Sequence, residues 1–261
     1  MAPRPASEAW PGVIRCELPG GGRVLFTARA SGNLSTMRGA GHELGAAARD
    51  RMRAELGLRR LCAGAQVHGS TVRRDLPGDR PGDDLLPVQA DGQATSSGRV
   101  GVMVLTADCL PVVIASRAAV AAVHAGWRGL AAGVLEEGVR AVRELGAASA
   151  STSHEAPAPP EPGSAEEIVA IIGPGAGPCC YVVGVEVHAA LGSPVQAGPA
   201  APDGGAAAPI DLKAIACERL LEAGASSVRD LGLCTICDER FYSHRREAQH
   251  AGRQAGIAWL S

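Results

Sequence analysis

The 261-residue sequence predicts a mixed-sheet α/β protein. Three observations favour this class. Apolar β-rich runs interleave with segments of helical periodicity, and several of these runs are joined by short turns that suit antiparallel pairing. Hydrophobic residues make up 46% of the chain, which is enough for a substantial core in one large domain or two small ones. We find no internal repeat.

The first half of the chain is expected to contain mainly strands. One helix is predicted over 43–56, where apolar residues recur near helical spacing and Gly57 provides a stop. A Gly/Pro/Asp-rich loop is expected to run to about residue 88. The predicted strands are 13–16, 23–27, 61–68, 100–106, 110–115 and 119–124.

The second half alternates helices and strands around two surface segments. Residues 129–145 carry an apolar stripe of helical period that Gly146 can close. Asp211 is a plausible N-cap for a second helix, whose apolar positions start at Leu212. Strands are expected at 168–172 and 228–231. Residues 147–166 and 192–209 are rich in Pro, Ala, Ser and Gly, so we expect flexible insertions there.

Composition excludes several function classes. The formal net charge is −2 and aromatic residues make up 3% of the chain, so nothing favours nucleic acid or an anionic membrane as a partner. The N-terminal residues lack the apolar run of a secretory signal, and no apolar run approaches the roughly 18 residues of a membrane span. We expect a soluble cytoplasmic protein whose eight cysteines are free, buried or metal-bound rather than paired in disulfides.

Three residues form a candidate metal site. If the apolar hairpin turns at Ser116 and Arg117, Cys109 and His124 face each other across the ladder, with Cβ atoms about 4.5–5.5 Å apart. His68, in the stretch QVHG, would complete a His₂Cys set. Three protein ligands and an open fourth position are typical of catalytic zinc. Taken singly, the cysteine is more typical of a small core residue and each histidine of a partly exposed polar group; their occurrence together is what favours a metal site.

Other residues are candidates for binding anions or for acid/base chemistry. Arg128 follows His124 at a helix start, where free N–H groups also favour anions. The loop from Gly173 to Pro178 is a second backbone-rich segment that equally suits a simple turn. Asp108 is an acid/base candidate only if it faces the pocket, and otherwise a structural carboxylate. Arginines 51, 245 and 246 are anion candidates, or else solvated surface residues.

The remaining cysteine motifs are interpreted as structural. A zinc ribbon needs two Cys-x-x-Cys pairs, and the sequence offers only the pair Cys234 and Cys237. Cys179 and Cys180 are adjacent, which is the wrong spacing for a zinc knuckle. We therefore interpret these four residues as structural or unassigned, and a second metal site is the less favoured alternative.

Five sequence blocks resemble one known family. The blocks QVHG, ADGQATSSGRVGVMVLTADCLPVVIA, VAAVHAGWRG, IGPGAGPCCYVVGVEV and FYSHRR…GRQAGIAWL are together similar to the laccase-domain family, also known as YfiH or PgeF proteins. The resemblance spans about 61–260. It implies an α/β (α+β) fold with one layered domain over 1–261, in which mixed sheets pack between helices. It also implies that His68, Cys109 and His124 bind zinc.

Two parts of the chain depart from the family pattern. The N-terminal block is altered around Asn33-Leu34, Gly41-His42 and Asp50-Arg51, and His244 stands where an aromatic residue is usual. We therefore do not count His244 as a ligand. The substrate contacts we predict are Arg51, Arg128, Gly173 and Gly177.

The resemblance implies a zinc-dependent purine nucleoside phosphorylase. Its expected substrates are phosphate with adenosine, inosine or methylthioadenosine, and adenosine deaminase activity is expected beside it. The alternatives are a peptidoglycan-precursor editing hydrolase with Cys109 as nucleophile, a copper-dependent polyphenol oxidase, and a non-catalytic metal-binding module. Seven histidines, none in a His-x-His pair, are few for multicopper chemistry. We expect a monomer or small homo-oligomer.

Overall fold

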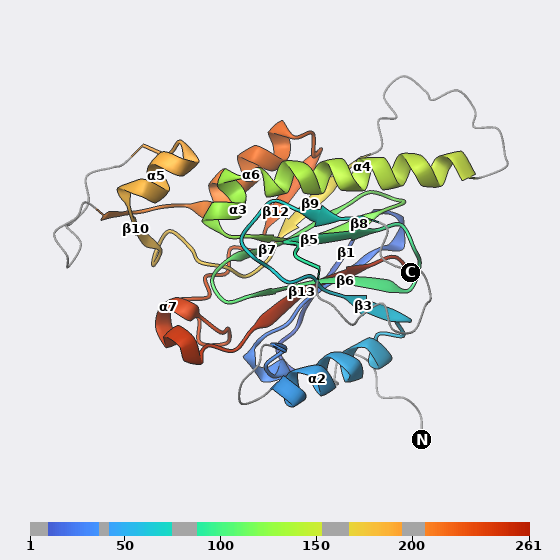
Figure 1. Cartoon of the computed structure of the whole chain (residues 1–261), viewed down its shortest axis with the longest axis horizontal. Helices are drawn as coiled ribbons and strands as arrows, with labels where there is room; N and C mark the ends of the chain where they lie inside the picture. Colours follow the sequence, from blue (N-terminus) through green and yellow to red (C-terminus); the bar gives the residue numbers. More distant parts are fainter. Residues whose placement is uncertain (1–9, 37–41, 75–87, 153–166, 195–206) are drawn as a thin grey trace.

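The computed structural model describes residues 10–36, 42–74, 88–152, 167–194 and 207–261. Two β-sheets pack face to face, and helices cover their outer faces (Figure 1). The predicted mixed α/β class is thereby confirmed.

The first sheet has five strands in the order β1-β2-β13-β6-β3. Their bounds are β1 Ile14–Glu17, β2 Arg23–Phe26, β13 Gln254–Trp259, β6 Val100–Thr106 and β3 Arg60–Cys62. Only the pair of β3 with β6 is parallel. Helix α2 (His42–Glu55) lies on the outer side of this sheet, where Met52 packs with Leu25 and Ile257.

The second sheet has six strands in the order β12-β9-β7-β8-β5-β4. Their bounds are β12 Ser227–Asp230, β9 Val169–Ile172, β7 Leu110–Ala115, β8 Val120–Ala125, β5 Gly92–Thr95 and β4 Val72–Arg73. The two outermost pairs are parallel, and the inner pairs are antiparallel. Helices α4 (Val134–Thr152) and α6 (Leu212–Glu222) cover its outer face (Figure 1).

Strand β7 shows how one sequence serves two apolar layers. Val112 and Ile114 are buried against α4 and α6, whereas Val113 and Ala115 are buried between the two sheets. Successive side chains of a strand point to opposite faces, so a strand buried on both faces is apolar throughout. The continuous run LPVVIA therefore marks the centre of the fold.

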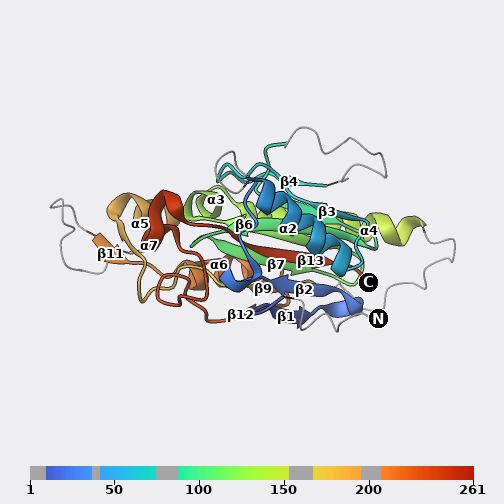
Figure 2. The ribbon, with the colours of Figure 1, turned by 90° about the horizontal axis from the view of Figure 1, so that it is seen from below.

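The short elements gather at one end of the molecule. Helices α3 (Trp127–Ala131), α5 (Val185–Leu191) and α7 (His244–Glu247) lie there in both views (Figures 1 and 2). A two-stranded sheet of β10 (Val182–Gly184) and β11 (Ala207–Pro209) extends from the same end. Since α3 follows β8 directly, the open end of the β7–β8 hairpin faces this cluster. None of the helices in the described part of the chain has the length and apolarity needed to cross a membrane.

Three predicted segments differ from the structure. The helix over 129–145 is two helices, because Gly133 adopts a φ of 84° that ends α3 and starts α4 in a new direction. Gly146 does not end α4, which continues to Thr152 and so includes the first residues of the insertion expected at 147–166. The loop expected at 192–209 ends in strand β11. The remainders of these two insertions, 153–166 and 195–206, lie outside the described residues.

The strand predicted over 61–68 is also wrong beyond Cys62. At Gln66, hydrogen bonds from the side-chain amide replace the backbone hydrogen bonds of a strand. Gln66 Nε2 donates to Leu105 O (2.7 Å), and Gln66 Oε1 accepts from Leu105 N (2.8 Å). The other predicted strands and helices are confirmed, with bounds that differ by at most one residue, and the Asp211 side chain caps α6 as expected.

Candidate metal centre

The β7–β8 hairpin brings Cys109 near His124, but in a different register from the one predicted. The turn lies at residues 117 and 118, closed by a hydrogen bond from Ser116 N to Ala119 O (2.9 Å). His124 consequently pairs with Pro111, two residues beyond Cys109. The prediction that Cys109 and His124 lie directly opposite each other is therefore wrong. Both side chains still lie on one face of the sheet, because side chains two residues apart along a strand point to the same side.

The three predicted ligands converge in space. One ligand atom from each of His68, Cys109 and His124 lies within 4.8 Å of the others. Cys109 Sγ lies 3.9 Å from His68 Nε2, and the two imidazole rings meet edge to face with centroids 4.8 Å apart. His124 is buried, Cys109 is half-buried and His68 is exposed, so the group opens to solvent on one side.

Asp91, which the sequence analysis missed as a site residue, organises this group. Its buried carboxylate lies 2.8 Å from His124 Nδ1 and accepts hydrogen bonds from the backbone N–H groups of Val67, His68 and Gly69 (3.1, 2.8 and 2.7 Å). Burial would raise the pKa of Asp91, but the hydrogen bonds from His124 and from the backbone hold that pKa below its ordinary value. A carboxylate on Nδ1 fixes the ring so that Nε2 faces the centre.

Backbone conformation is specialised around the ligands. His68 has a φ of 61° and Asp108 a φ of 86°, a left-handed region that residues other than glycine rarely adopt. The hydrogen bonds to Asp91 hold His68 in this conformation. Gly126 leaves room for the sulfur: a Cβ there would lie 2.9 Å from Cys109 Sγ and 3.1 Å from His68 Cδ2.

Cys109 and His124 also perturb each other electrostatically. Burial opposes charge on both groups, but the imidazolium of His124 and its hydrogen bond lower the pKa of the Cys109 thiol to about 6. The thiolate of Cys109 and the hydrogen bond to Asp91 raise the pKa of His124 to about 9. Without a metal ion, the two groups therefore form a thiolate–imidazolium pair near neutral pH.

Asp108 is a structural carboxylate rather than an acid/base group facing the centre. It is buried and accepts hydrogen bonds from Thr235 Oγ1 (2.7 Å), Ser243 Oγ (3.1 Å) and Arg245 N (2.6 Å). Its backbone carbonyl accepts from Ala176 N (2.7 Å). These contacts from three separate segments fix the backbone immediately before Cys109.

The two arginines predicted to bind substrate lie in different places. Arg128 is an exposed residue of α3, four positions after His124, and its guanidinium stacks over the Trp127 ring at 4.3 Å from the ring centroid. Arg51 lies on α2, where its guanidinium covers the Trp10 ring at 4.4 Å from the centroid. It lines a groove of about 630 Å³ that also includes Ser31 and Asn33.

The two predicted glycines are explained first by close packing. A Cβ at Gly173 would lie 2.3 Å from the ring of Phe26. Gly177 lies against Cys234, and its N–H donates to Cys234 Sγ (3.2 Å). A substrate contact from either glycine stays a prediction.

Arginines 245 and 246 serve the C-terminal loop. Arg245 Nη1 donates to Val182 O (3.1 Å), and its guanidinium lies over the Tyr181 ring. Arg246 donates to the carbonyls of Thr235 and Ile236 (3.0 and 2.8 Å). His244 Nδ1 lies 2.9 Å from Ala248 O.

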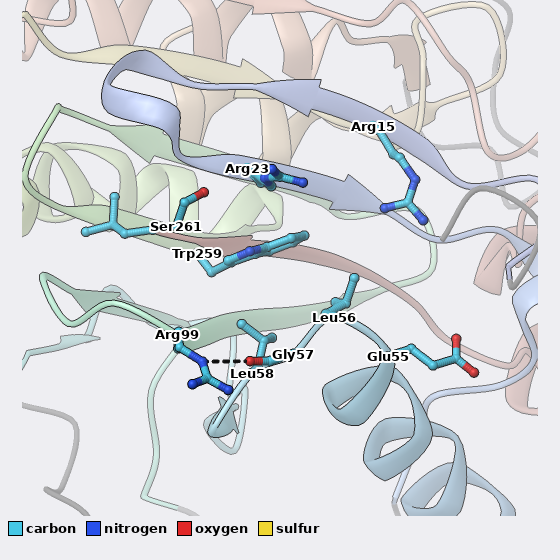
Figure 3. A pocket seen from close by; sticks show the side chains of 10 residues that line it. Arg15, Arg23, Glu55, Leu56, Gly57, Leu58, Arg99, Trp259 and Ser261 are labelled. Atoms are coloured by element: carbon cyan, nitrogen blue, oxygen red, sulfur yellow. Dashed lines mark hydrogen bonds between the residues drawn. The ribbon is translucent and has the colours of Figure 1, made fainter. Parts of the chain in front are cut away.

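A separate pocket of about 260 Å³ lies far from the candidate metal centre. Figure 3 shows Arg15, Arg23, Arg99 and Trp259 around it, with Arg99 Nε donating to Gly57 O (3.0 Å). Arg99 precedes β6, whereas Cys109 follows the other end of that strand. Seven strand residues span about 23 Å, so this pocket and the metal centre lie at opposite ends of the sheet.

Comparison with known proteins now identifies the family. Residues 21–261 match the family described as multi-copper polyphenol oxidoreductase laccase. The chain belongs to this family.

Relatives within this laccase family carry an enzyme name. A Xylella fastidiosa protein named purine nucleoside phosphorylase is 39% identical over 218 residues, covering 75% of this chain and 70% of its own length. An Escherichia coli protein named purine nucleoside phosphorylase YfiH is 34% identical over 199 residues, covering 75% of this chain and 72% of its own length. The crystal structure of YlmD from Geobacillus stearothermophilus superposes with a TM-score of 0.74 at 28% identity. The match covers 95% of this chain and 96% of that chain.

The donor set of this laccase-family chain fits zinc. Two imidazoles, one acidified thiol and a carboxylate behind His124 form the ligand pattern of catalytic zinc. A His₂Cys set also suits a single copper ion. Metal-ligating side chains gather in two groups of three or more within the described ranges, and the second group contains only cysteines. The described residues therefore do not build the histidine cluster of a multicopper oxidase.

Proposed function

We propose that this protein is a zinc-dependent purine nucleoside phosphorylase of the cytoplasm, and that His68, Cys109 and His124 hold the zinc. The observation that carries the proposal is the convergence of these three side chains, with Asp91 behind His124. The names of relatives that share 34–39% identity with the chain support the same activity.

Phosphorolysis places defined demands on the chain. A phosphate oxygen attacks C1′ of the ribose, the bond from C1′ to N9 breaks, and the purine leaves with the electron pair and takes up a proton. The products are ribose 1-phosphate and the free base. When bound, zinc supplies a Lewis acid that polarises an oxygen ligand at the open position.

The protein's own residues supply positioning and charge. Asp91 keeps His124 and the backbone of the His68 segment in place, so that the centre is formed before substrate arrives. Arg128 lies on the helix that follows His124 and is assigned to the phosphate. Arg51, Gly173 and Gly177 are proposed as further substrate contacts.

Adenosine, inosine and methylthioadenosine are the proposed nucleosides, with deamination of adenosine as a second activity. Deamination replaces the amino group at C6 with a water-derived oxygen and releases ammonia. A zinc ion held by His68, Cys109 and His124 would supply the Lewis acidity that this chemistry uses.

A nucleoside assay on protein of known zinc content tests the proposal. The three nucleosides are incubated with and without phosphate and the bases separated by liquid chromatography. We expect phosphate-dependent release of free base, lost together with zinc in Cys109→Ala and His124→Ala. Cys217→Ser is the matched control, since Cys217 lies on α6 outside both cysteine-containing groups. No turnover by fully loaded protein would overturn the proposal.

One observation favours a second candidate. The lowered pKa of Cys109 beside His124 also suits a cysteine nucleophile in a hydrolase, such as one acting on peptidoglycan precursors. Metal dependence separates the two: a cysteine hydrolase is inhibited when zinc occupies its thiolate, whereas the phosphorylase requires zinc.

A further inference from the structure

Four cysteines lie together outside the metal centre. Cys179 and Cys180 belong to the loop between β9 and β10, and Cys234 and Cys237 to the segment after β12. The parallel pairing of β9 with β12 brings these segments side by side, and an isolated bridge between Gly175 and Cys234 continues the contact. The two segments are more than fifty residues apart in the sequence, so a search for local zinc motifs does not connect them.

The spacing of the four sulfur atoms suits one metal ion. All four Sγ atoms lie within 4.8 Å of one another, and those of Cys179 and Cys237 are 3.8 Å apart. A tetrahedral zinc ion with zinc–sulfur bonds of about 2.3 Å places its sulfur ligands about 3.8 Å from one another. Small shifts of side chains therefore complete the coordination, whereas a cluster of several iron ions needs wider spacing between the cysteines.

The backbone around the cysteines is built to accept a thiolate. Gly177 N donates to Cys234 Sγ at 3.2 Å, and a Cβ at Gly177 would lie 3.1 Å from Cys234 Cβ and 3.4 Å from the sulfur of Cys179. N–H groups directed at a sulfur stabilise its charged form. A side chain at position 177 would therefore press the two loops apart by a few tenths of an ångström.

We propose that Cys179, Cys180, Cys234 and Cys237 bind one structural zinc ion. Four thiolates close the coordination sphere, which is the pattern of a structural rather than a catalytic site. Binding displaces the thiol protons and involves no electron transfer. None of the four ligands belongs to the candidate metal centre of His68, Cys109 and His124, and the proposal does not depend on the proposed function.

The site has a consequence for Cys109. The two loops that the ion joins hold Asp108 from two sides, through Ala176 N to its carbonyl and Thr235 Oγ1 to its carboxylate. Asp108 directly precedes Cys109 and has a φ of 86°. By joining these two loops, the structural zinc ion would fix the backbone of Asp108 and so the position of the Cys109 sulfur.

Metal content measured by mass spectrometry tests the site on the full-length protein, reduced and loaded with Zn²⁺. We expect two zinc ions per chain in the wild type. Cys237→Ser is expected to lose the structural ion and Cys109→Ala the other, so the two variants lose different ions. When Co²⁺ replaces Zn²⁺ in Cys109→Ala, the protein should show the intense thiolate-to-cobalt absorption of four sulfur ligands. Adding Cys237→Ser to this variant should weaken that absorption. Cys217→Ser again serves as the control.

Thiol alkylation of the wild type tests the site without any variant. Cys179 and Cys237 are exposed, so both should react rapidly with iodoacetamide after zinc is removed and slowly once Zn²⁺ is restored. Equal alkylation with and without Zn²⁺ would overturn the proposal. So would a zinc content unaffected by Cys237→Ser.

Discussion

Replacing Asp91 by asparagine tests the organisation of the metal centre most sharply. In the wild type, one carboxylate oxygen accepts from His68 N and His124 Nδ1, and the other accepts from Val67 N and Gly69 N. An amide of the same shape has one acceptor oxygen and one NH₂ group that cannot accept. Asp91→Asn therefore leaves two of the four donors without an acceptor, the backbone donors among them being part-buried.

The expected effect follows from these contacts. A fully buried donor left unsatisfied costs about 1–3 kcal/mol. Because the backbone donors here are part-buried, the free energy of unfolding should fall by about 1–3 kcal/mol in total. Loss of the carboxylate behind a histidine ligand typically reduces metal affinity 10–100-fold, which corresponds to about 1.4–2.8 kcal/mol. The pKa of His124 should also fall, because the hydrogen bond to Asp91 helps to raise it.

The assay is competition for Zn²⁺ with a chelator of known affinity, alongside thermal unfolding of the zinc-loaded and zinc-free protein. Circular dichroism establishes that the variant is folded at the temperature used. Asp50→Asn is the matched control, since Asp50 is an exposed residue of α2 paired with Arg53. Wild-type zinc affinity and an unchanged melting temperature in Asp91→Asn would refute the role assigned to this carboxylate.

The remaining predictions concern Cys109, its neighbours and the metal. In zinc-free protein, the alkylation rate of Cys109 should rise with pH and show an inflection near pH 6. His124→Ala should move that inflection up toward pH 9. An inflection near pH 9 in the wild type would contradict the thiolate–imidazolium pair. Gly126→Ala should weaken zinc binding about tenfold because its Cβ crowds the sulfur, whereas Gly98→Ala, whose nearest contact is at 3.9 Å, should bind zinc normally. Stripping zinc with a chelator should lower the melting temperature, and re-addition of Zn²⁺ should restore it; an unchanged melting temperature would argue against both metal sites.

The thiolate–imidazolium pair should influence reactivity more than stability. The raised pKa of His124 contributes stability that is present below its ordinary value of 6.5 and is lost as pH rises through about 9. The lowered pKa of Cys109 contributes stability that is present above its ordinary value of 9.0 and is lost as pH falls through about 6. Between these limits one contribution grows as the other declines, so their changes with pH largely offset each other and stability should vary little from about pH 6 to 9.

Local patterns predicted most of the fold because each element carries its own signal. The continuous apolar run of β7 and the N-cap at Asp211 needed no tertiary information. The failures arose where tertiary contacts replaced local ones. The segment ending at His68 has the apolar content of a strand, but Gln66 binds the backbone of Leu105 through its side chain. Gly133 divides one helical stripe into two helices at a φ of 84°.

The candidate site was predicted in part. His68, Cys109 and His124 were identified from their places along the strands, and a hairpin displaced by two residues still brings Cys109 and His124 to one face. Asp91 was missed although it lies in the block ADGQAT, because only its distance to His124 reveals its role. The four clustered cysteines form only one Cys-x-x-Cys pair along the sequence. The pairing of β9 with β12 brings their two segments together, which local spacing does not reveal.

We propose above all that this centre transfers a ribosyl group to phosphate. The most direct measurement is a phosphorus NMR spectrum of inosine and phosphate incubated with zinc-loaded protein. We predict ribose 1-phosphate in equal amount to free hypoxanthine, and no product from His124→Ala. Free ribose formed at the same rate without phosphate, or no cleavage of inosine, adenosine or methylthioadenosine, would contradict it.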